Sequence, residues 1–190
     1  MPGFRVDGQD SFVSKLALGG ARASLFQASF QLLGEDGKAG APEAKTFSFM
    51  CKGIQIPATS AGVVNVNYMG RGVKIPGVRV FEDLTTTILN DEDYGLRNKV
   101  ENWMHKINSH FGNVRSKKFE NKLGTQKYST DMSLQSLGKA GGVLGTWTFY
   151  NIFPTSLDQI DVNWEPNDAI MEYAVTWAYD YWLMDGVNST

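Results

Sequence analysis

The stretch from Ile170 to Leu183 constrains the fold most, because its residues alternate in character with a period of two. Bulky side chains fall on one side of the predicted strand, and small or acidic side chains fall on the other. A strand of this kind buries its bulky face and turns the other toward water or a partner. The bulky positions are Met171, Tyr173, Val175, Trp177, Tyr179, Tyr181 and Leu183, and the opposite positions are Glu172, Ala174, Thr176, Ala178 and Asp180.

Similar alternation predicts other strands, at residues 24–33, 46–53, 63–69, 84–89, 128–137 and 143–151. In the apolar run after residue 69, we expect Gly70, Gly72, Pro76 and Gly77 to interrupt any long ladder. A cysteine and two phenylalanines, Phe47, Phe49 and Cys51, are expected to face inward. The pattern indicates a mainly β fold of the α+β class, a two-sheet sandwich or barrel.

One helix is predicted from Asp91 to His110, packed by one apolar stripe against a sheet. Asn90 is a plausible cap, and the acids at 91–93 suit the first turn of a helix. The apolar residues recur at helical spacing: Leu96, Val100, Trp103, Met104, Ile107 and Phe111. The fold is therefore expected to carry a single flanking helix.

Length and charge suggest one domain whose two ends differ. The 190 residues suit an N-terminal arm at 1–23, a single domain at 24–185 and a short tail at 186–190. From residue 140 onward the chain has seven acids and no Lys or Arg. Either these acids lie on unrelated solvated faces, or acidic surface meets basic surface within the fold or between copies.

The sequence offers no convincing catalytic, metal or cofactor site, and we expect no enzyme activity. His105 and His110 are five residues apart, which in a helix places them about 140° apart and unlike an i, i+4 metal pair. Cys51 reads as a small buried hydrophobe. A basic stretch, Arg115–Lys127, could touch nucleic acid but is more typical of a solvated or partner-facing loop. No run of residues suits a signal peptide or a membrane anchor.

Two segments carry a resemblance to a known family. The first is Phe81 to Trp103, with its strand, its Asn-Asp-Glu turn and Arg97; the second is Ile152 to Trp182, with Phe153-Pro154-Thr155, Asp161-x-x-Trp164, Asn167-Asp168 and Asp180-Tyr181-Trp182. Together with FSFMCKGIQIPA, these segments resemble the tail tube proteins of T4-like contractile-tailed bacteriophages. The resemblance covers most of residues 24–183, but not the arm, the 35–44 loop or the 112–142 region.

This resemblance implies a structural virion protein that is assembled in the host cytoplasm. It implies hexameric rings that stack into a hollow tube, inside a contractile sheath, as a conduit for DNA ejection. The implied partners are further copies of the chain, the tail sheath, the baseplate, the tail terminator, the tape-measure protein and, transiently, DNA. The alternative that the resemblance leaves open is the inner tube of an extracellular contractile injection system or tailocin, which carries protein cargo. A small β-sandwich binding module is the alternative from another class.

Assembly needs surfaces, and two are predicted. Segment 54–81 is apolar without an obvious place to pack, so we expect it to reach a neighbouring subunit or ring. The expected contact residues are Ile54, Pro57, Met69, Arg71, Val73, Ile75 and Val78. A conduit for DNA should not grip phosphate, so the small acidic face carrying Glu172, Thr176 and Asp180 is expected to line the lumen.

Overall fold

The computed structural model describes residues 20–30, 47–116, 128–164 and 170–185. Most of the expected arm, the 35–44 loop, residues 117–127 and the 186–190 tail lie outside this part of the chain. The described strands are β1 (Phe26–Phe30), β2 (Cys51–Gln55), β3 (Thr59–Tyr68), β4 (Arg71–Phe81), β5 (Leu84–Leu89), β6 (Thr130–Leu137), β7 (Val143–Leu157), β8 (Glu172–Ala178) and β9 (Tyr181–Met184). The helix α3 spans Gly95–Ile107.

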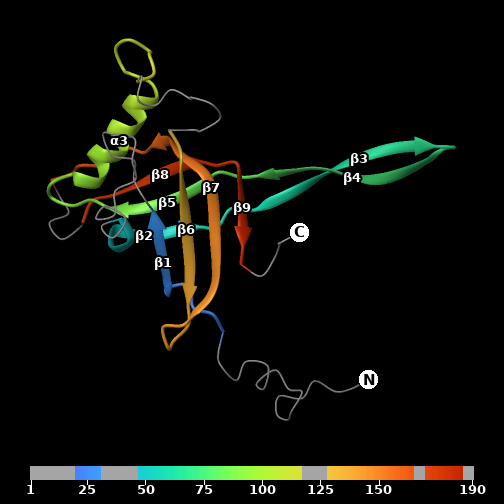
Figure 1. Ribbon diagram of the computed structural model, residues 1–190, viewed down its shortest axis with the longest axis horizontal. Coiled ribbons are helices and arrows are strands. Elements are labelled where there is room, and N and C mark those ends of the chain that lie inside the picture. The colour runs from blue at the N-terminus through green and yellow to red at the C-terminus, as the bar shows by residue number, and fades with distance from the viewer. Residues whose placement is uncertain (1–19, 31–46, 117–127, 165–169, 186–190) are drawn as a thin grey trace.

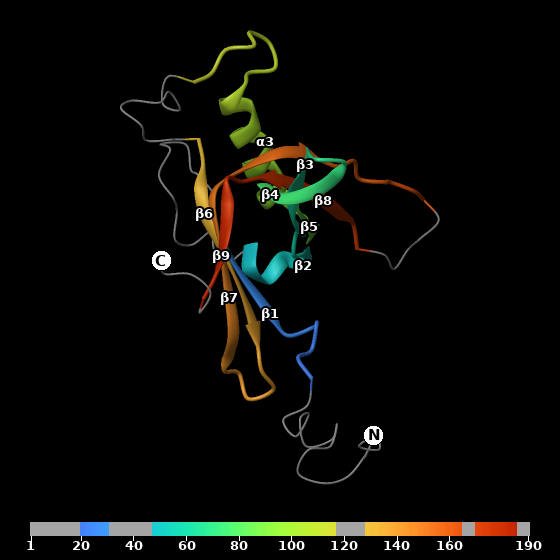
Figure 2. The same cartoon turned by 90° about the vertical axis from the view of Figure 1, so that its right-hand side faces the viewer.

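The body is an antiparallel sheet folded across itself. Its strand order is β1-β6-β7-β8-β5-β2, with β9 paired to β7. Figure 1 shows β1, β6, β9 and the start of β7 running across the direction of β2, β5 and β8, and Figure 2 shows the same two layers from the side. This confirms the predicted two-layer, mainly β fold with a flanking helix.

Strand β7 joins the two layers because it is long enough to belong to both. Its first part pairs with β6 and β9, and its last part pairs with β8. Between them Asn151 adopts a left-handed conformation, with φ of 56°. The amide N–H of Asn151 donates to Asp131 Oδ1 at 3.0 Å, and its side-chain amide donates to Asp180 Oδ2 at 2.6 Å. These contacts hold the bend where the chain changes layers.

The core between the layers and α3 is an aromatic cluster. Ring centroids of Phe30 and Trp177 lie 4.8 Å apart, those of Phe30 and Trp103 5.8 Å, and those of Phe30 and Phe47 5.1 Å. Buried indole N–H groups need acceptors: Trp177 Nε1 donates to Thr86 Oγ1 at 2.9 Å, and Trp103 Nε1 donates to the carbonyl oxygen of Tyr128 at 2.8 Å. The core is therefore apolar, with the indole donors of Trp103 and Trp177 satisfied, whereas the Trp182 Nε1–H is buried without a partner.

The predicted strand at 170–183 is in fact two strands in different layers. Tyr173, Val175 and Trp177 of β8 are buried as expected. The chain then turns at residues 179–180 and pairs with β7 as β9. Met171, which precedes β8, and Tyr181, which begins β9, are both exposed, so the prediction that they share one buried face was wrong. Phe49 was also misplaced: residues 47–50 are helical, so Phe47 and Cys51 point inward while Phe49 is exposed.

Helix α3 is shorter than the predicted span from Asp91 to His110. Tyr94 is left-handed, with φ of 52°, so the helix begins only at Gly95. Asp91 lies before the first turn of the helix, and its Oδ1 accepts a hydrogen bond from the amide N–H of Gly95 at 3.0 Å. The helix ends at Ile107 in front of an extended Asn108. Its buried residues are Leu96, Val100 and Trp103, which confirms the predicted stripe.

Candidate assembly surfaces

Strands β3 and β4 form a two-stranded sheet of their own, a long hairpin that projects from the body (Figure 1). Its ladder runs from Thr59↔Phe81 to Tyr68↔Arg71. The expectation that Gly70, Gly72, Pro76 and Gly77 would interrupt a long ladder was wrong. Each strand of the hairpin has a single neighbour, and an edge strand tolerates proline because its other side needs no hydrogen-bond donor.

Two glycine positions explain the local geometry of this hairpin. At the tip, Met69 and Gly70 both have positive φ, 46° and 77°. Together they form a two-residue hairpin turn, whose backbone twist matches that of the flanking strands. Nearer the body, the register shifts between Ala61 and Val63, where β4 has one extra residue. A Cβ on Gly77 would lie 3.0 Å from the carbonyl oxygen of Gly62, so the strands approach closely there.

One face of the hairpin is mainly apolar, with Ser60 near the body and Arg71, opposite Tyr68, at the tip. Cross-strand pairs Val64↔Ile75 and Val66↔Val73 share this face, and the bulge keeps Val80, opposite Ser60, on the same side. At the tip, the Tyr68 side chain is 68% exposed. We define the hairpin face as the aliphatic and aromatic side chains of this surface: Val64, Val66, Tyr68, Val73, Ile75 and Val80.

The base of the hairpin is held by aromatic contacts. The Phe81 ring centroid lies 6.3 Å from that of Tyr179 and 6.4 Å from that of Trp182. The Tyr179 hydroxyl donates to the carbonyl oxygen of Glu82, next to the end of β4. Burial raises the pKa of Tyr179 to about 12, and the Asp83 and Glu82 carboxylates add to the rise. The hairpin is thus anchored to the turn between β8 and β9.

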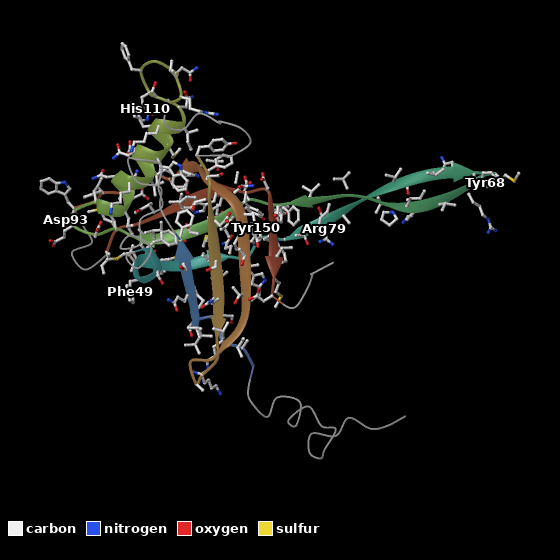
Figure 3. All side chains as sticks on the ribbon, viewed as in Figure 1. Phe49, Tyr68, Arg79, Asp93, His110 and Tyr150 are labelled. Carbon is white, nitrogen blue, oxygen red and sulfur yellow. The ribbon has the colours of Figure 1, made fainter. Side chains whose placement is uncertain are left out.

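The structure separates the predicted contact residues into two groups. Met69, at the tip, and the β4 residues Arg71, Val73, Ile75 and Val78 lie exposed on the hairpin, as Figure 3 shows for the region between the labelled Tyr68 and Arg79. Ile54 and Pro57 instead belong to the body, where Ile54 packs against the core and Pro57 is buried.

Sequence reasoning missed part of the hairpin face. It predicted a strand at 63–69 but did not include Val64, Val66 and Tyr68 among the expected contact residues. The available signal was the pairing of two alternating runs around Met69-Gly70, since such a hairpin has an apolar face whether or not the body covers it.

The second predicted surface, the outer face of β8, lies on the side away from α3. Glu172 is exposed, and Ala174, Thr176 and Ala178 are half-buried. On this face the register places Thr85 beside Thr176 and Thr87 beside Ala174. The face is therefore small and largely uncharged, with hydroxyl groups rather than long side chains.

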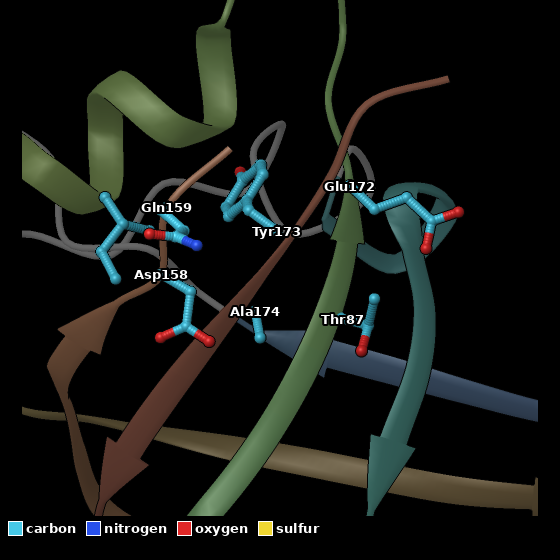
Figure 4. Close-up of a pocket in the computed structure, with 7 residues that line it drawn as sticks. Thr87, Asp158, Gln159, Glu172, Tyr173 and Ala174 are labelled. Carbon is cyan, nitrogen blue, oxygen red and sulfur yellow. The ribbon is translucent and has the colours of Figure 1, made fainter. Parts of the chain in front are cut away.

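A shallow depression lies on this β8 face, and Figure 4 shows Thr87 and Ala174 between the carboxylates of Asp158 and Glu172. Glu172 forms an ion pair with Lys52. Tyr173 also lines the depression, and burial raises its pKa to about 12, with the Arg97 guanidinium opposing the rise. No metal-binding cluster of three or more His, Cys, Asp or Glu occurs among the described residues.

Asp180 does not belong to the β8 face. It follows the end of β8, where it accepts the hydrogen bond from Asn151 at the bend of β7. Of the three acidic or polar residues predicted to line a lumen together, the structure brings only Glu172 and Thr176 onto one strand face.

The two histidines lie together, contrary to the helical spacing assumed for them. Because α3 ends at Ile107, the chain turns back and places His110 Nδ1 2.9 Å from His105 Nδ1. His105 Nδ1 also accepts the amide N–H of His110 at 3.3 Å. The two imidazoles are thus linked by a hydrogen bond just beyond the end of the helix, and both side chains are exposed as predicted.

Cys51 is a buried thiol, as expected from sequence. Burial raises its pKa to about 11, so it is a protonated thiol rather than a thiolate at neutral pH. Within the described residues, no helix combines the length and apolarity needed to cross a membrane.

Solved structures with this architecture come from contractile assemblies. A chain of the sheath–tube complex of an extracellular contractile injection system (PVC) matches with a TM-score of 0.59 and 18% identity, covering 94% of this chain and all of that one. A chain in the baseplate of the anti-feeding prophage matches with a TM-score of 0.63 and 14% identity, covering 90% of this chain and 98% of that one. At these identities the likeness concerns the fold.

The sequence relationship narrows the class to a family. The family model for phage tail tube proteins matches residues 19–185, so the chain belongs to the phage tail tube protein family and is a structural component of a phage tail. It is 28% identical over 166 residues to tail tube protein gp19 of Enterobacteria phage T4, covering 85% of this chain and 90% of that protein. The tail tube protein of Serratia phage KSP90 is 26% identical over 141 residues, covering 74% of this chain and 76% of that protein.

Proposed function

We propose that this tail tube protein assembles, without catalysing a reaction, into hexameric rings that stack into a hollow conduit. The observation that carries the proposal is the hairpin face, which no other described element covers. A monomer rarely exposes a contiguous apolar surface of this extent unless a partner covers it. Neighbouring copies of the chain are that partner.

The sheet edges of the body support the same conclusion. Strand β1 pairs only with β6 and β2 only with β5, so within the described residues each leaves one side of its backbone unpaired. Open edges invite pairing with another chain, and a closed ring of identical copies removes them all. Residues 1–23, as an arm, add contacts between copies, residues 24–185 form the single tube domain and residues 186–190 a short tail.

The cargo of the conduit is DNA leaving a capsid, because the relatives that match by sequence are phage tail tube proteins. The tube lies inside a contractile sheath, between baseplate and tail terminator, around a tape-measure protein, and is assembled in the host cytoplasm. The outer face of β8 lines the lumen, since its small hydroxyl and alkyl groups offer phosphate no strong attachment. A tube reconstruction in which this face points toward the sheath would exclude that assignment.

Electron microscopy of the purified full-length protein tests the proposal directly. Rings, or tubes with a hollow centre and six-fold symmetry, are the expected result. A monodisperse monomer at every concentration would contradict it and would favour a monomeric binding module instead. The matched control is a double substitution on the hairpin face, Val66→Ser with Ile75→Ser. It removes the apolar surface but leaves the core unchanged, so this variant should stay folded and form fewer rings or tubes.

A further inference from the structure

The end of helix α3 brings together both histidines of the chain. The whole sequence contains two, His105 and His110. Their spacing separates them only if the helix continues through residue 110, and α3 ends at Ile107. Their Nδ1 atoms lie 2.9 Å apart, while the centroids of their rings lie 4.9 Å apart. The rings therefore face each other through their Nδ1 edges, and both side chains are exposed to ions in solvent.

The turn that carries the second histidine is held by its own hydrogen bonds. The Ser109 hydroxyl oxygen accepts the amide N–H of Gly112 at 3.3 Å and that of Val114 at 3.2 Å. Ser116 N donates to the carbonyl oxygen of Lys106 at 3.0 Å, which returns the chain to the helix. The two imidazoles are thus placed side by side before any ligand binds.

Two imidazole nitrogens at this separation suit one divalent transition-metal ion. A neutral imidazole has one nitrogen with a free lone pair, and it is the commonest side-chain ligand of metals. Two metal–nitrogen bonds of about 2.0–2.1 Å at a right angle place the nitrogens about 2.9 Å apart, whereas a tetrahedral angle places them about 3.3 Å apart. The observed separation matches the right angle, which is the geometry of Cu²⁺ and Ni²⁺ in sites of nitrogen and oxygen ligands.

The exposed face of α3 adds polar groups beside the pair. Asn98, Glu101 and Asn102 precede His105 by seven, four and three residues, so they form one stripe on the helix. They line a shallow depression together with both histidines. The Glu101 carboxylate brings negative charge, which favours a cation over the anions of the solvent. No group of three or more metal-binding side chains occurs among the described residues, so the pair supplies two ligands and water supplies the rest.

We propose that His105 and His110 bind one Cu²⁺ or Ni²⁺ ion through their Nδ1 atoms. The ion takes both lone pairs and replaces the hydrogen bond between the imidazoles and the 3.3 Å contact from the His110 amide to His105 Nδ1. It fastens the turn at residues 108–116 to the last turn of α3. This site goes beyond the proposed tube function, and Figure 3 shows His110 well apart from Tyr68 at the tip of the hairpin.

Calorimetric titration of the full-length, tag-free chain with NiCl₂ at neutral pH tests the site. The Val66→Ser, Ile75→Ser background lowers assembly during the titration, and we expect one ion per chain. His105→Gln and His110→Gln should each weaken the affinity by about tenfold or more, because each removes one of two protein ligands. The matched control is Asn102→Ala, which alters the same depression but keeps both imidazoles, and its affinity should stay within about twofold.

Electron paramagnetic resonance with Cu²⁺ identifies the ligand atoms. The bound ion should couple to two imidazole nitrogens, and to one in either single-histidine variant. Because the chain has no other histidine, these couplings are assigned without further substitutions. Folded protein, checked by circular dichroism, that binds neither ion would overturn the site. Equal binding by the two histidine variants and the native pair would overturn it as well, as would an equal loss in Asn102→Ala.

Hydrogen exchange tests whether the ion fastens the turn. With Ni²⁺, the amides of residues 109–114 should exchange more slowly in the chain with both histidines and at an unchanged rate in His110→Gln. Unchanged exchange in both chains would overturn the fastening.

These measurements also keep the metal site separate from the tube. A native chain that forms neither rings nor tubes contradicts the proposed function, but its titration with NiCl₂ still reports on the two histidines. Tubes formed by a chain that binds no metal would leave the tube standing and remove the site.

Discussion

Strand β5 and the β3–β4 hairpin have similar sequences and opposite environments. Both alternate β-branched residues with polar ones, yet Leu84, Thr86 and Ile88 of β5 are buried while Val64 and Val66 of β3 are exposed. The difference lies in their neighbours: β5 runs between β2 and β8 under the aromatic core, and β3 pairs only with β4. Alternation thus indicates that a face will be covered, but not whether its own chain covers it.

The largest expected effect is a loss of stability in the body, where the chain covers its own apolar face. Trp177→Ala empties the centre of the aromatic cluster and removes the indole donor to Thr86, so the free energy of unfolding should fall by about 3–5 kcal/mol. Urea denaturation measures it, with the Val66→Ser, Ile75→Ser chain as an unassembled background. Trp177→Phe keeps most of the volume and should lose less; equal losses would contradict the packing role.

Substitutions on the hairpin face should weaken assembly and leave the stability of the protomer nearly unchanged. Val66→Ser with Ile75→Ser is expected to reduce assembly by about tenfold or more while changing the unfolding free energy of the unassembled chain by less than about 0.5 kcal/mol. Analytical ultracentrifugation and urea denaturation give the two readings. A large loss of stability with assembly intact would mean that the hairpin face packs within the protomer.

A smaller effect is expected where the hairpin strands approach most closely. In Gly77→Ala the new methyl group would meet the Gly62 carbonyl oxygen at 3.0 Å, so the strands must separate at a cost of about 1–3 kcal/mol confined to the hairpin. The melting temperature of the body should stay nearly constant while assembly weakens. Gly53→Ala is the control, since a Cβ there has no neighbour within 4 Å; equal assembly of both variants would argue against the close approach.

The last expected effect is absent at neutral pH and appears only under alkaline conditions. Folding raises the pKa of Tyr173 from 10.0 to about 12 and that of Cys51 from 9.0 to about 11, chiefly by burial. Well below pH 9 both groups are protonated in both states, so their stabilising contribution is complete. As the pH rises the unfolded chain ionises first, and stability is lost between pH 9 and 12.

Tyr173→Phe isolates the Tyr173 share of this loss, because Tyr179, whose pKa is also raised to about 12, is left in place. Melting temperatures between pH 8 and pH 12 should decline less steeply in this variant. At pH 8 its stability should equal or slightly exceed that of the native chain, because the Tyr173 hydroxyl is buried without a hydrogen-bond partner. An unchanged decline would contradict the assignment.

Much of the body follows from sequence periodicity. The strand at 84–89, the buried row Tyr173, Val175 and Trp177, and the apolar stripe of the helix are all present as predicted. These succeed because each is a local pattern whose covered face lies toward a core built by the same chain.

The failures share a different origin, because each depends on where the chain turns. A left-handed Tyr94 delays the helix, and an extended Asn108 ends it early enough to bring His110 back onto His105. The turn at residues 179–180 moves Asp180 off the β8 face, and a bulge lets the β3–β4 ladder pass Pro76 and Gly77. Single non-glycine residues with positive φ, and bulges in edge strands, carry weak sequence signals.

The span of β7 across both layers also determines how the body opens. Its backbone is hydrogen-bonded to β6, β9 and β8, so neither layer separates without breaking that strand's own ladder, and its slowest amide protons exchange with solvent only when the whole body unfolds. The hairpin shares none of these bonds and opens by itself. For the proposed tube we therefore expect subunits to be added with their bodies already folded, so that the conformational entropy lost at each addition is largely that of the hairpin.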